Sequence, residues 1–190
     1  MAVFSVPVND HTLTNVFPVP ALEATELGRI VLLDDVPANG ESWFIGRCFE
    51  ELRGEVVGVV SFSDPFARSA VDGTVVHPGH VGTIYQATNG VYLGQSRAEA
   101  IRLLPDGRCL SRRAIQKLRK REQGHEYVAE VLRGFGGAGD VGDLDRLTRV
   151  VRHPGNHKYC WAIDRRMRRH LPDGLPYPKL HQGEQLRLAV

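Results

Sequence analysis

The stretch HPGHVGTIYQATNGVYLGQS, residues 77–96, sets histidine, hydroxyl, amide and phenol side chains among apolar residues. Its apolar and aromatic content predicts a strand over residues 81–87, and the Asn89-Gly90 pair predicts the turn that follows. A strand that only fills a core does not need so many polar groups. We therefore expect this strand and its turn to hold a polar ligand at one end.

On both sides of this stretch, patterns typical of strands alternate with patterns typical of helices. Upstream, apolar runs predict strands over residues 30–33 and 56–62, and helically spaced apolar residues predict a helix over residues 44–52 between them. Downstream, we expect a hairpin around residues 105–107 and a helix that begins after Ser111. Because hairpins interrupt the alternation, the sequence predicts an α/β fold with a mixed central sheet flanked by helices rather than a pure doubly wound sheet.

The composition is that of a globular protein, with 190 residues, 42% hydrophobic and 24% charged. No apolar run approaches the roughly 20 residues that a membrane helix needs, and the N-terminal segment does not resemble a signal peptide. The three cysteines form no CxxC pair, which disfavours a disulfide framework and a zinc ribbon. We expect one domain in the cytoplasm, without membrane association.

The net charge of +2 conceals a strong asymmetry along the chain. Residues 1–65 contain more acidic than basic residues, whereas residues 108–121 contain seven basic residues and no acidic one. Residues 146–170 contain eight lysines and arginines and one acidic residue, Asp164. Such segregation is typical of a protein that contacts phosphates, although two solvated helix faces would give the same count.

The tripeptide His-Pro-Gly occurs at residues 77–79 and 153–155, and another histidine, His80 or His157, follows each copy closely. Each copy precedes a predicted strand, whereas Asp64 follows one. In an antiparallel sheet the start of one strand lies beside the end of its neighbour, so we expect His80, His157 and Asp64 to converge. Two histidines and a carboxylate suit general acid–base chemistry or an iron site. The structural alternative is that the histidines cap strand ends.

Other polar side chains are expected to contact a ligand nearby. Tyr85 is suited to donating a proton or stacking on a base, and Asn89 to bonding the edge of an amide or nucleobase. In SFSDP, two serines and Asp64 end a buried strand, where α/β folds place ligands. The structural alternative is that the segment is an ordinary core strand. Asn89-Gly90 would then only allow the positive φ that the following turn requires. The candidate ligand-binding residues are Ser61, Ser63, Thr83, Asn89, Ser96 and Asn156.

The segment LSRRAIQKLRKR predicts an amphipathic basic helix. Its cations and Gln116 share one side by helical spacing, while Ile115 and Leu118 lie on another. Such a helix suits contact with phosphates, and a glutamine can reach a base edge. The glycine-rich segment GFGGAGDVG follows a helix rather than a strand, so it predicts a loop and no dinucleotide site. The candidate nucleic-acid contacts are Arg112, Arg113, Gln116, Lys117, Arg119, Lys120, Arg165 and Arg169.

Four motifs in order, VVGVVSFSDP, HPGHVGTIYQATNGVYLG, LLPDGRCLSRRAIQKLRKRE and HPGNHKYCWAIDRRMRRHLP with LPYPK, resemble the Mom family of phage DNA-modification proteins. The resemblance extends over residues 33–179. It implies the fold of the GNAT acyltransferases, in which helices flank a mixed central sheet. We accordingly expect a single domain over residues 1–190, with an irregular N-terminal extension at residues 1–28 and a basic helical insertion at residues 108–134.

The resemblance also implies an activity. The family's founding member converts adenine in viral DNA to an N6-carbamoylmethyl (acetamido) derivative, which blocks host restriction enzymes. For this chain it implies a transferase-like enzyme that acts on double-stranded DNA, with the target base taken out of the stack. Matching positions suggest that Tyr85, Asn89 or Tyr159 contacts that base. The expected catalytic residues are Asp64, His80, Tyr85, His157 and Tyr159.

Two cofactors are compatible with the resemblance. Iron has been proposed for the family, and His80, His157 and Asp64 would be its ligands. Acetyl-CoA or another acyl donor would supply the added group, but SFSDPFARSAVDG stands where a GNAT enzyme carries its glycine-rich coenzyme A loop. Two alternatives remain open at this point: a GNAT-type acyltransferase acting on a small amine or a protein, and a basic DNA-binding protein without chemistry.

Overall fold

The structure is a computed structural model that describes residues 1–37 and 39–179. These residues form two compact units. Within the described residues, the first unit comprises residues 1–64, 80–96 and 156–179, and the second comprises residues 65–79 and 97–155. The single domain predicted over residues 1–190 also includes residues 38 and 180–190, which lie outside the described residues.

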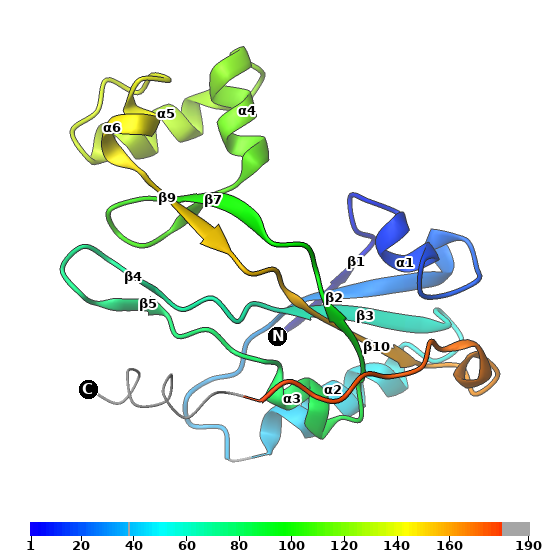
Figure 1. Cartoon of the computed structure of the whole chain (residues 1–190). Helices are drawn as coiled ribbons and strands as arrows, with labels where there is room; N and C mark the ends of the chain where they lie inside the picture. Colours follow the sequence, from blue (N-terminus) through cyan, green and yellow to red (C-terminus); the bar gives the residue numbers. More distant parts are fainter. Residues whose placement is uncertain (38, 180–190) are drawn as a thin grey trace. The chain divides into compact units, whose positions relative to one another are not determined.

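The first unit is built on a five-stranded sheet with the order β1-β2-β3-β10-β6 (Figure 1). β2 runs parallel to β3, and the other neighbouring pairs are antiparallel. The mixed α/β fold class predicted from the sequence is therefore confirmed, while the likeness to GNAT enzymes stays a prediction. The strands are β1 (Ala2–Ser5), β2 (Ala24–Ile30), β3 (Gly58–Ser63), β6 (Val91–Gln95) and β10 (His157–Ala162).

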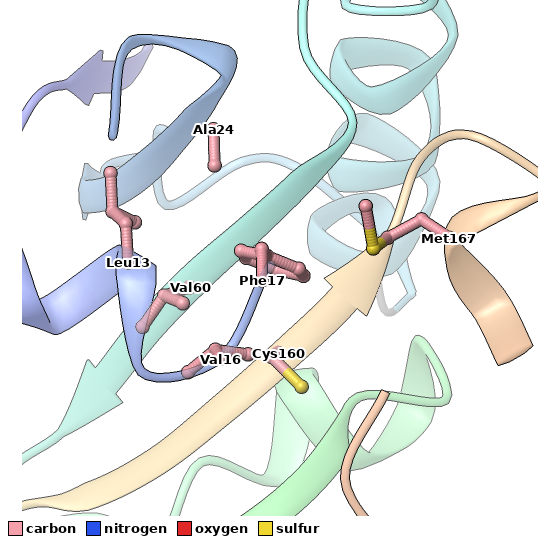
Figure 2. Close-up of a cluster of buried hydrophobic side chains, with 7 residues drawn as sticks. All are labelled: Leu13, Val16, Phe17, Ala24, Val60, Cys160 and Met167. Carbon is pink, nitrogen blue, oxygen red and sulfur yellow. The ribbon is translucent and has the colours of Figure 1, made fainter. Parts of the chain in front are cut away.

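Each face of this sheet carries its own buried cluster, because successive strand residues point to opposite faces. Helices α2 (Gly40–Glu51) and α3 (Thr83–Ala87) lie on one side of the sheet (Figure 1). There Ile45 of α2 and Tyr85 of α3 pack with Tyr159 and Trp161 of β10. On the other face, α1 (His11–Thr14), the chain after it and the 3-10 helix η2 (Met167–His170) provide the cover. Figure 2 shows this second cluster, formed by Leu13, Val16, Phe17, Ala24, Val60, Cys160 and Met167.

The second unit contains an antiparallel sheet with the order β8-β7-β9 and a short β4-β5 pair. Three helices accompany them, and Leu110, Leu118, Val128 and Leu132 form part of a separate buried cluster. The elements are β4 (Arg68–Ser69), β5 (Val75–His77), β7 (Glu99–Leu103), β8 (Cys109–Leu110), α4 (Arg112–Lys120), α5 (His125–Gly134), α6 (Asp143–Leu147) and β9 (Arg149–His153).

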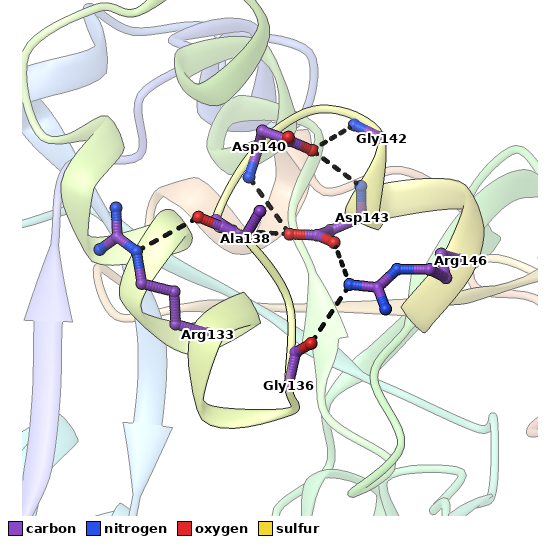
Figure 3. A network of polar contacts seen from close by, with 8 residues as sticks. Arg133, Gly136, Ala138, Asp140, Gly142, Asp143 and Arg146 are labelled. Carbon is purple, nitrogen blue, oxygen red and sulfur yellow. Dashed lines mark hydrogen bonds and ion pairs between the residues drawn. The ribbon is translucent and has the colours of Figure 1, made fainter.

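The glycine-rich segment is a loop, as predicted, and one carboxylate holds it to α6 (Figure 3). Asp143, only 2% exposed, accepts hydrogen bonds from the backbone N–H groups of Gly139 (2.7 Å) and Asp140 (3.2 Å). It also forms an ion pair with Arg146 at 2.7 Å, and Arg146 donates to the carbonyl of Gly136. The hydrogen bond from Arg146 is the main reason why the pKa of Asp143 is lowered.

Several local predictions are confirmed. The helix upstream of β3 is α2, the hairpin around residues 105–107 is formed by β7 and β8, and the basic helix is α4. Ser111 caps α4 by accepting a hydrogen bond from the backbone N–H of Ala114 at 3.1 Å. Gly124, with φ +82°, separates α4 from α5.

Three predictions are wrong. Residues 1–28 are not an irregular extension, because they contain β1, α1 and most of β2 and contribute Leu13 and Phe17 to the core. The strand expected at residues 30–33 lies earlier, at Ala24–Ile30, where it pairs with β1 and β3. The strand expected at residues 81–87 is instead helix α3, because tertiary packing of Tyr85 overrides strand propensity.

The basic insertion expected at residues 108–134 is part of a larger element of the fold. It belongs to the second unit, which the chain forms in two excursions from the first, over residues 65–79 and 97–155. β8, α4 and α5 therefore share their unit with β7 and β9, which flank the predicted insertion.

Candidate active site

The candidate site lies where β3 ends and β10 begins. Because the two strands are antiparallel, His157, the first residue of β10, is the direct cross-strand partner of Ser63, the last residue of β3. On its other side His157 pairs with Gln95 of β6. Directly opposed side chains share a face of the sheet with Cβ atoms about 5 Å apart. The ladder therefore sets Ser63 and His157 side by side.

The imidazole of His157 is nearly buried, with 8% of the residue exposed. Its Nδ1 atom lies 2.8 Å from the hydroxyl of Tyr92 on β6, and the two rings meet edge to face with centroids 5.5 Å apart. Burial lowers the pKa of His157, and the charge of His80 lowers it further. His157 is therefore neutral at pH 7, the form in which a histidine can accept a proton.

His80 and Asp64 lie beside this pair. The backbone N–H of His80 donates to the carbonyl of Asp64 at 2.8 Å, which joins the segment before α3 to the end of β3. Asp64 directly follows Ser63, and the charge of His80 is the second cause that lowers the pKa of His157. The backbone thus places Asp64 and His80 at the end of β3, beside the start of β10, while the convergence of the three side chains stays a prediction.

The two serines of SFSDP differ in their surroundings. The Ser61 hydroxyl donates to the carbonyl of Leu27 at 2.8 Å and is hydrogen-bonded to Tyr85, so its polar group is used within the fold. Ser63 is completely buried, yet its hydroxyl has no hydrogen-bond partner among the described residues. Buried polar groups are nearly always paired in native proteins, so the Ser63 hydroxyl is a candidate contact for a ligand.

Asn156 and Ser96 join the start of β10 to the end of β6. The backbone N–H of Asn156 donates to the Ser96 hydroxyl, and the backbone N–H of Ser96 donates to the Asn156 carbonyl, both at 2.8 Å. These bonds give Ser96 a structural role. The side-chain oxygen of Asn156 is buried without a partner in the described part of the chain, which makes it a second candidate ligand contact.

Tyr85 and Tyr159 are core residues, contrary to the prediction that they contact an extruded base. Tyr85 is 5% exposed and Tyr159 is fully buried, so neither offers a ring face for stacking. The Tyr159 hydroxyl donates to the carbonyl of Val81 and accepts a hydrogen bond from Gln86 at 3.1 Å. Burial is the main cause that raises the pKa of Tyr159 to about 12, so it remains a phenol.

Thr83 and Asn89 occupy the two ends of α3 and are both exposed. Asn89 adopts a left-handed conformation, with φ +57°, in the turn that the Asn-Gly pair predicted. It lines a pocket of about 590 Å³ with Arg53, Trp161 and Arg168, near the far end of β10 from His157. Asn89 therefore does not belong to the His157 cluster.

The sequence did not single out Tyr92 or Gln86 as site residues. The only signal for Tyr92 is its place in the motif HPGHVGTIYQATNGVYLG, which does not reveal its contact with His157. Gln86 donates to Tyr159, to the carbonyl of Val81 and to the carbonyl of Pro178, at 3.1–3.3 Å. Both roles depend on residues more than 60 positions away along the chain.

The expected iron site does not fit the residues present. Over residues 1–37 and 39–179, no three His, Cys, Asp or Glu side chains are grouped so that they could hold a metal ion. The prediction that His80, His157 and Asp64 form a facial triad is therefore wrong for this arrangement, and we derive no step through a metal.

The basic residues of α4 fall into two sets. Arg112 forms an ion pair with Glu99 at 2.9 Å, and Arg113 forms one with Glu122 at 2.7 Å. Glu122 also accepts a hydrogen bond from Gln116 at 3.3 Å. The remaining cations of this helix, Lys117, Arg119 and Lys120, form no ion pair with any described residue.

A groove of about 860 Å³ runs between α4 and the β7–β8–β9 sheet of the second unit. Arg119 and Lys120 line it together with the apolar side chains of Ile115 and Val150. In the first unit, Arg165 and Arg169 flank the start of η2, where both are exposed and neither is ion-paired within the described chain. These cations remain available to a phosphate backbone.

Among the described residues, no helix is long and apolar enough to cross a membrane. The fold and the site together define a mixed α/β protein with a neutral, buried histidine at the strand ends and unpaired cations on its surface. The chain belongs to the Mom protein family, whose model matches residues 1–179. Membership indicates a role in the modification of phage DNA in general. No curated protein matches the sequence significantly.

Proposed function

We propose that this protein modifies the N6 amine of adenine in double-stranded phage DNA, adding a group of the carbamoylmethyl (acetamido) type that protects the DNA from host restriction. The observation that carries the proposal is the neutral His157, set beside Asp64 and His80 in a chain of the Mom family. The activity would take place in the cytoplasm of the host cell, on a scaffold of the GNAT type.

The chemistry requires a proton acceptor. When the N6 amine attacks the carbamoylmethyl carbon of a donor, a C–N bond forms as the donor's leaving group departs with its bonding electrons. The amine then loses one proton, which a positioned neutral imidazole can take. Burial and the charge of His80 both favour the neutral imidazole of His157. In this proposal Asp64 and His80, which are joined by a backbone hydrogen bond at the end of β3, would pass the proton on towards solvent.

The DNA would be held by cations that the fold leaves unpaired. An amine inside the duplex is out of reach, so the adenine must leave the stack before it reacts. Arg119 and Lys120 of α4, with Arg165 just before η2 and Arg169 within it, would contact phosphates. Ser63 and Asn156 supply buried hydrogen-bonding atoms for the ligand.

Co-expression with a plasmid tests this proposal. Nucleosides released from the plasmid should include an adenine derivative, detected by mass spectrometry, that is absent with His157→Asn. His170→Asn is the matched control, because His170 is exposed in η2, outside the site. Soluble wild-type protein with only unmodified nucleosides would refute the proposal.

The same samples separate the two alternatives. DNA binding without any modified nucleoside would identify a basic DNA-binding protein without chemistry. Tight binding of coenzyme A together with unmodified DNA would instead identify an acyltransferase that acts on a small amine or a protein.

A further inference from the structure

Tyr92 makes the one hydrogen bond that fixes the orientation of the His157 ring within the described structure. Its hydroxyl lies 2.8 Å from Nδ1, and the edge-to-face ring contact has centroids 5.5 Å apart. The two residues come from neighbouring strands, β6 and β10, so the sheet itself sets their separation. An imidazole held at one nitrogen by a second group exchanges protons through its other nitrogen.

Tyr92 is itself held rigidly. It is 8% exposed, and its ring packs against Tyr159 with centroids 5.2 Å apart. Its backbone carbonyl accepts a hydrogen bond from the N–H of Leu175 at 2.9 Å, which ties β6 to the chain after η2. Burial raises the pKa of Tyr92, so the residue stays a neutral phenol. A neutral phenol oxygen can accept a hydrogen bond from an imidazole N–H.

A buried polar atom without a partner among the described residues lies beside His157. Ser63, directly across the sheet from His157, is fully buried and its hydroxyl has no partner in the described chain. Gly82 closes over this hydroxyl so tightly that a Cβ atom there would lie 3.0 Å from it. The Ser63 hydroxyl is therefore enclosed beside His157, without a partner in the described chain.

We propose that Tyr92 is a positioning residue: it accepts a hydrogen bond from Nδ1–H of His157 and thereby leaves Nε2 unprotonated, to take the proton from the substrate amine. This inference rests on the proposed function. The proton moves from the amine nitrogen to Nε2, and the resulting imidazolium keeps its Nδ1–H bonded to the phenol oxygen. The other neutral tautomer carries its proton on Nε2. At that atom it could only donate a hydrogen bond and could not take a proton from the amine.

Within the described residues, the titratable groups near His157 come from four positions around the strand ends. Tyr92 lies on β6, Tyr159 follows two residues later on β10, Asp64 follows β3 and His80 precedes α3. Tyr92 and Tyr159 stay uncharged, since burial raises the pKa of both, and the charge of His80 acts on His157 from outside the sheet. Tyr92→Phe removes one hydroxyl and keeps the aromatic packing.

Nitrogen NMR of the whole chain tests the inference without any assay of activity. In wild-type protein at neutral pH, His157, identified by the absence of its signals in His157→Asn, should be protonated at Nδ1 and not at Nε2. In Tyr92→Phe the proton should shift to Nε2, while Tyr127→Phe, which changes an exposed tyrosine of α5, should leave the signals unchanged. The yield of modified adenine should fall about tenfold or more with Tyr92→Phe, at unchanged DNA affinity.

A wild-type His157 protonated at Nε2, or a Tyr92→Phe spectrum identical to that of the wild type, would overturn the inference. So would an unchanged yield of modified adenine in Tyr92→Phe. The expected tautomers combined with no modified adenine from wild-type samples would overturn the proposed function alone, and would still support the orientation of His157 by Tyr92.

Discussion

Two separate causes lower the pKa of His157. Burial is the larger cause and the charge of His80 the second. A histidine with a lowered pKa gives up its proton more readily, and it is more often neutral at the pH of the cell. The chemistry that we propose for His157 therefore depends on residues that the fold brings to it from β6 and from the segment before α3.

We expect His157 to titrate below pH 6.5, its ordinary value, in an NMR titration of the histidine rings. His80→Ala should raise the pKa of His157, because it removes the second cause of the lowering. His170→Ala should have no such effect, since His170 lies outside the site. A wild-type midpoint at or above 6.5 would contradict the burial of this ring.

The lowered pKa of His157 also determines how its contribution to the free energy of unfolding changes with pH. The folded-state pKa of His157 is below its unfolded value, so the unfolded chain binds more protons once the pH falls below 6.5. The contribution of His157 to the free energy of unfolding is thus fully present above pH 6.5 and decreases as the pH falls towards the folded-state pKa. His157→Asn should weaken this part of the acid dependence, which denaturant unfolding at several pH values would measure.

Gly82 provides a second test at the residue scale. With φ +78° it has a conformation that L side chains rarely adopt, and an added Cβ would lie 2.8 Å from the Tyr159 ring and 2.9 Å from that of Tyr85. Gly73, with φ +90° and open space around it, is the matched control. We expect both Gly→Ala variants to be destabilised by about 1–2 kcal/mol for the backbone, and Gly82→Ala by about 1–3 kcal/mol more for the steric overlap.

Denaturant unfolding of the two glycine variants measures that difference. Equal destabilisation would show that the segment before α3 does not pack closely on Ser63 and Tyr159.

The sequence is sufficient to predict the positions of some of these residues, but there is a physical reason why it does not predict others. The place of Asp64 after β3 and of His157 at the start of β10 could be predicted, because position at a strand end is visible in the sequence, whereas His80 precedes a helix and not the expected strand. Tyr92 could not be predicted, because its role is a contact with a residue 65 positions away. Tyr85 and Tyr159 were interpreted as ligand contacts because a sequence does not show whether a tyrosine is buried.

Among the elements, α4 shows how a basic helix divides its charges. Arg112 and Arg113 are neutralised by Glu99 and Glu122, whereas Arg119 and Lys120 are exposed, and no described residue pairs with them. A cation that already has a carboxylate partner releases fewer counterions when it meets a phosphate, so we expect the two pairs to differ in DNA binding.

Two double variants test this division. Arg119→Ala with Lys120→Ala should lower the log–log slope of DNA affinity against salt by about 2, because each phosphate that is no longer neutralised reduces the slope by about 0.9. Arg112→Ala with Arg113→Ala should change the slope less. Equal changes from the two variants would contradict the ion pairs as the basis of the difference.

Helix α3 shows where prediction of an element failed. Val81, Ile84 and Tyr85 are residues typical of strands, but Gly82 turns the chain and Tyr85 packs into the cluster beside Trp161, with ring centroids 5.5 Å apart. The short helix is stable only because it packs on the sheet, since five residues could not form a helix alone. Local propensity does not contain that information.

For the whole molecule, the alternation of strand and helix patterns was enough to predict a mixed α/β fold. It was not enough to predict the second unit, which the chain forms in two separate excursions, nor the role of residues 1–28 in the sheet. Both features depend on pairing between segments that are distant in sequence. β1 pairs with β2, more than 20 residues later, and β7 pairs with β9, about 50 residues later.

For this member of the Mom family, we propose above all that it modifies adenine with His157 as the proton acceptor. Mass spectrometry of nucleosides from plasmid DNA, co-expressed with the wild type or with His157→Asn, tests that claim most directly. We predict that the wild type yields deoxyadenosine in which a carbamoylmethyl-type group on the base replaces one hydrogen, and that His157→Asn lowers its yield at least about a hundredfold while remaining folded. Unmodified deoxyadenosine from the wild type, or equal yields from the two proteins, would contradict it.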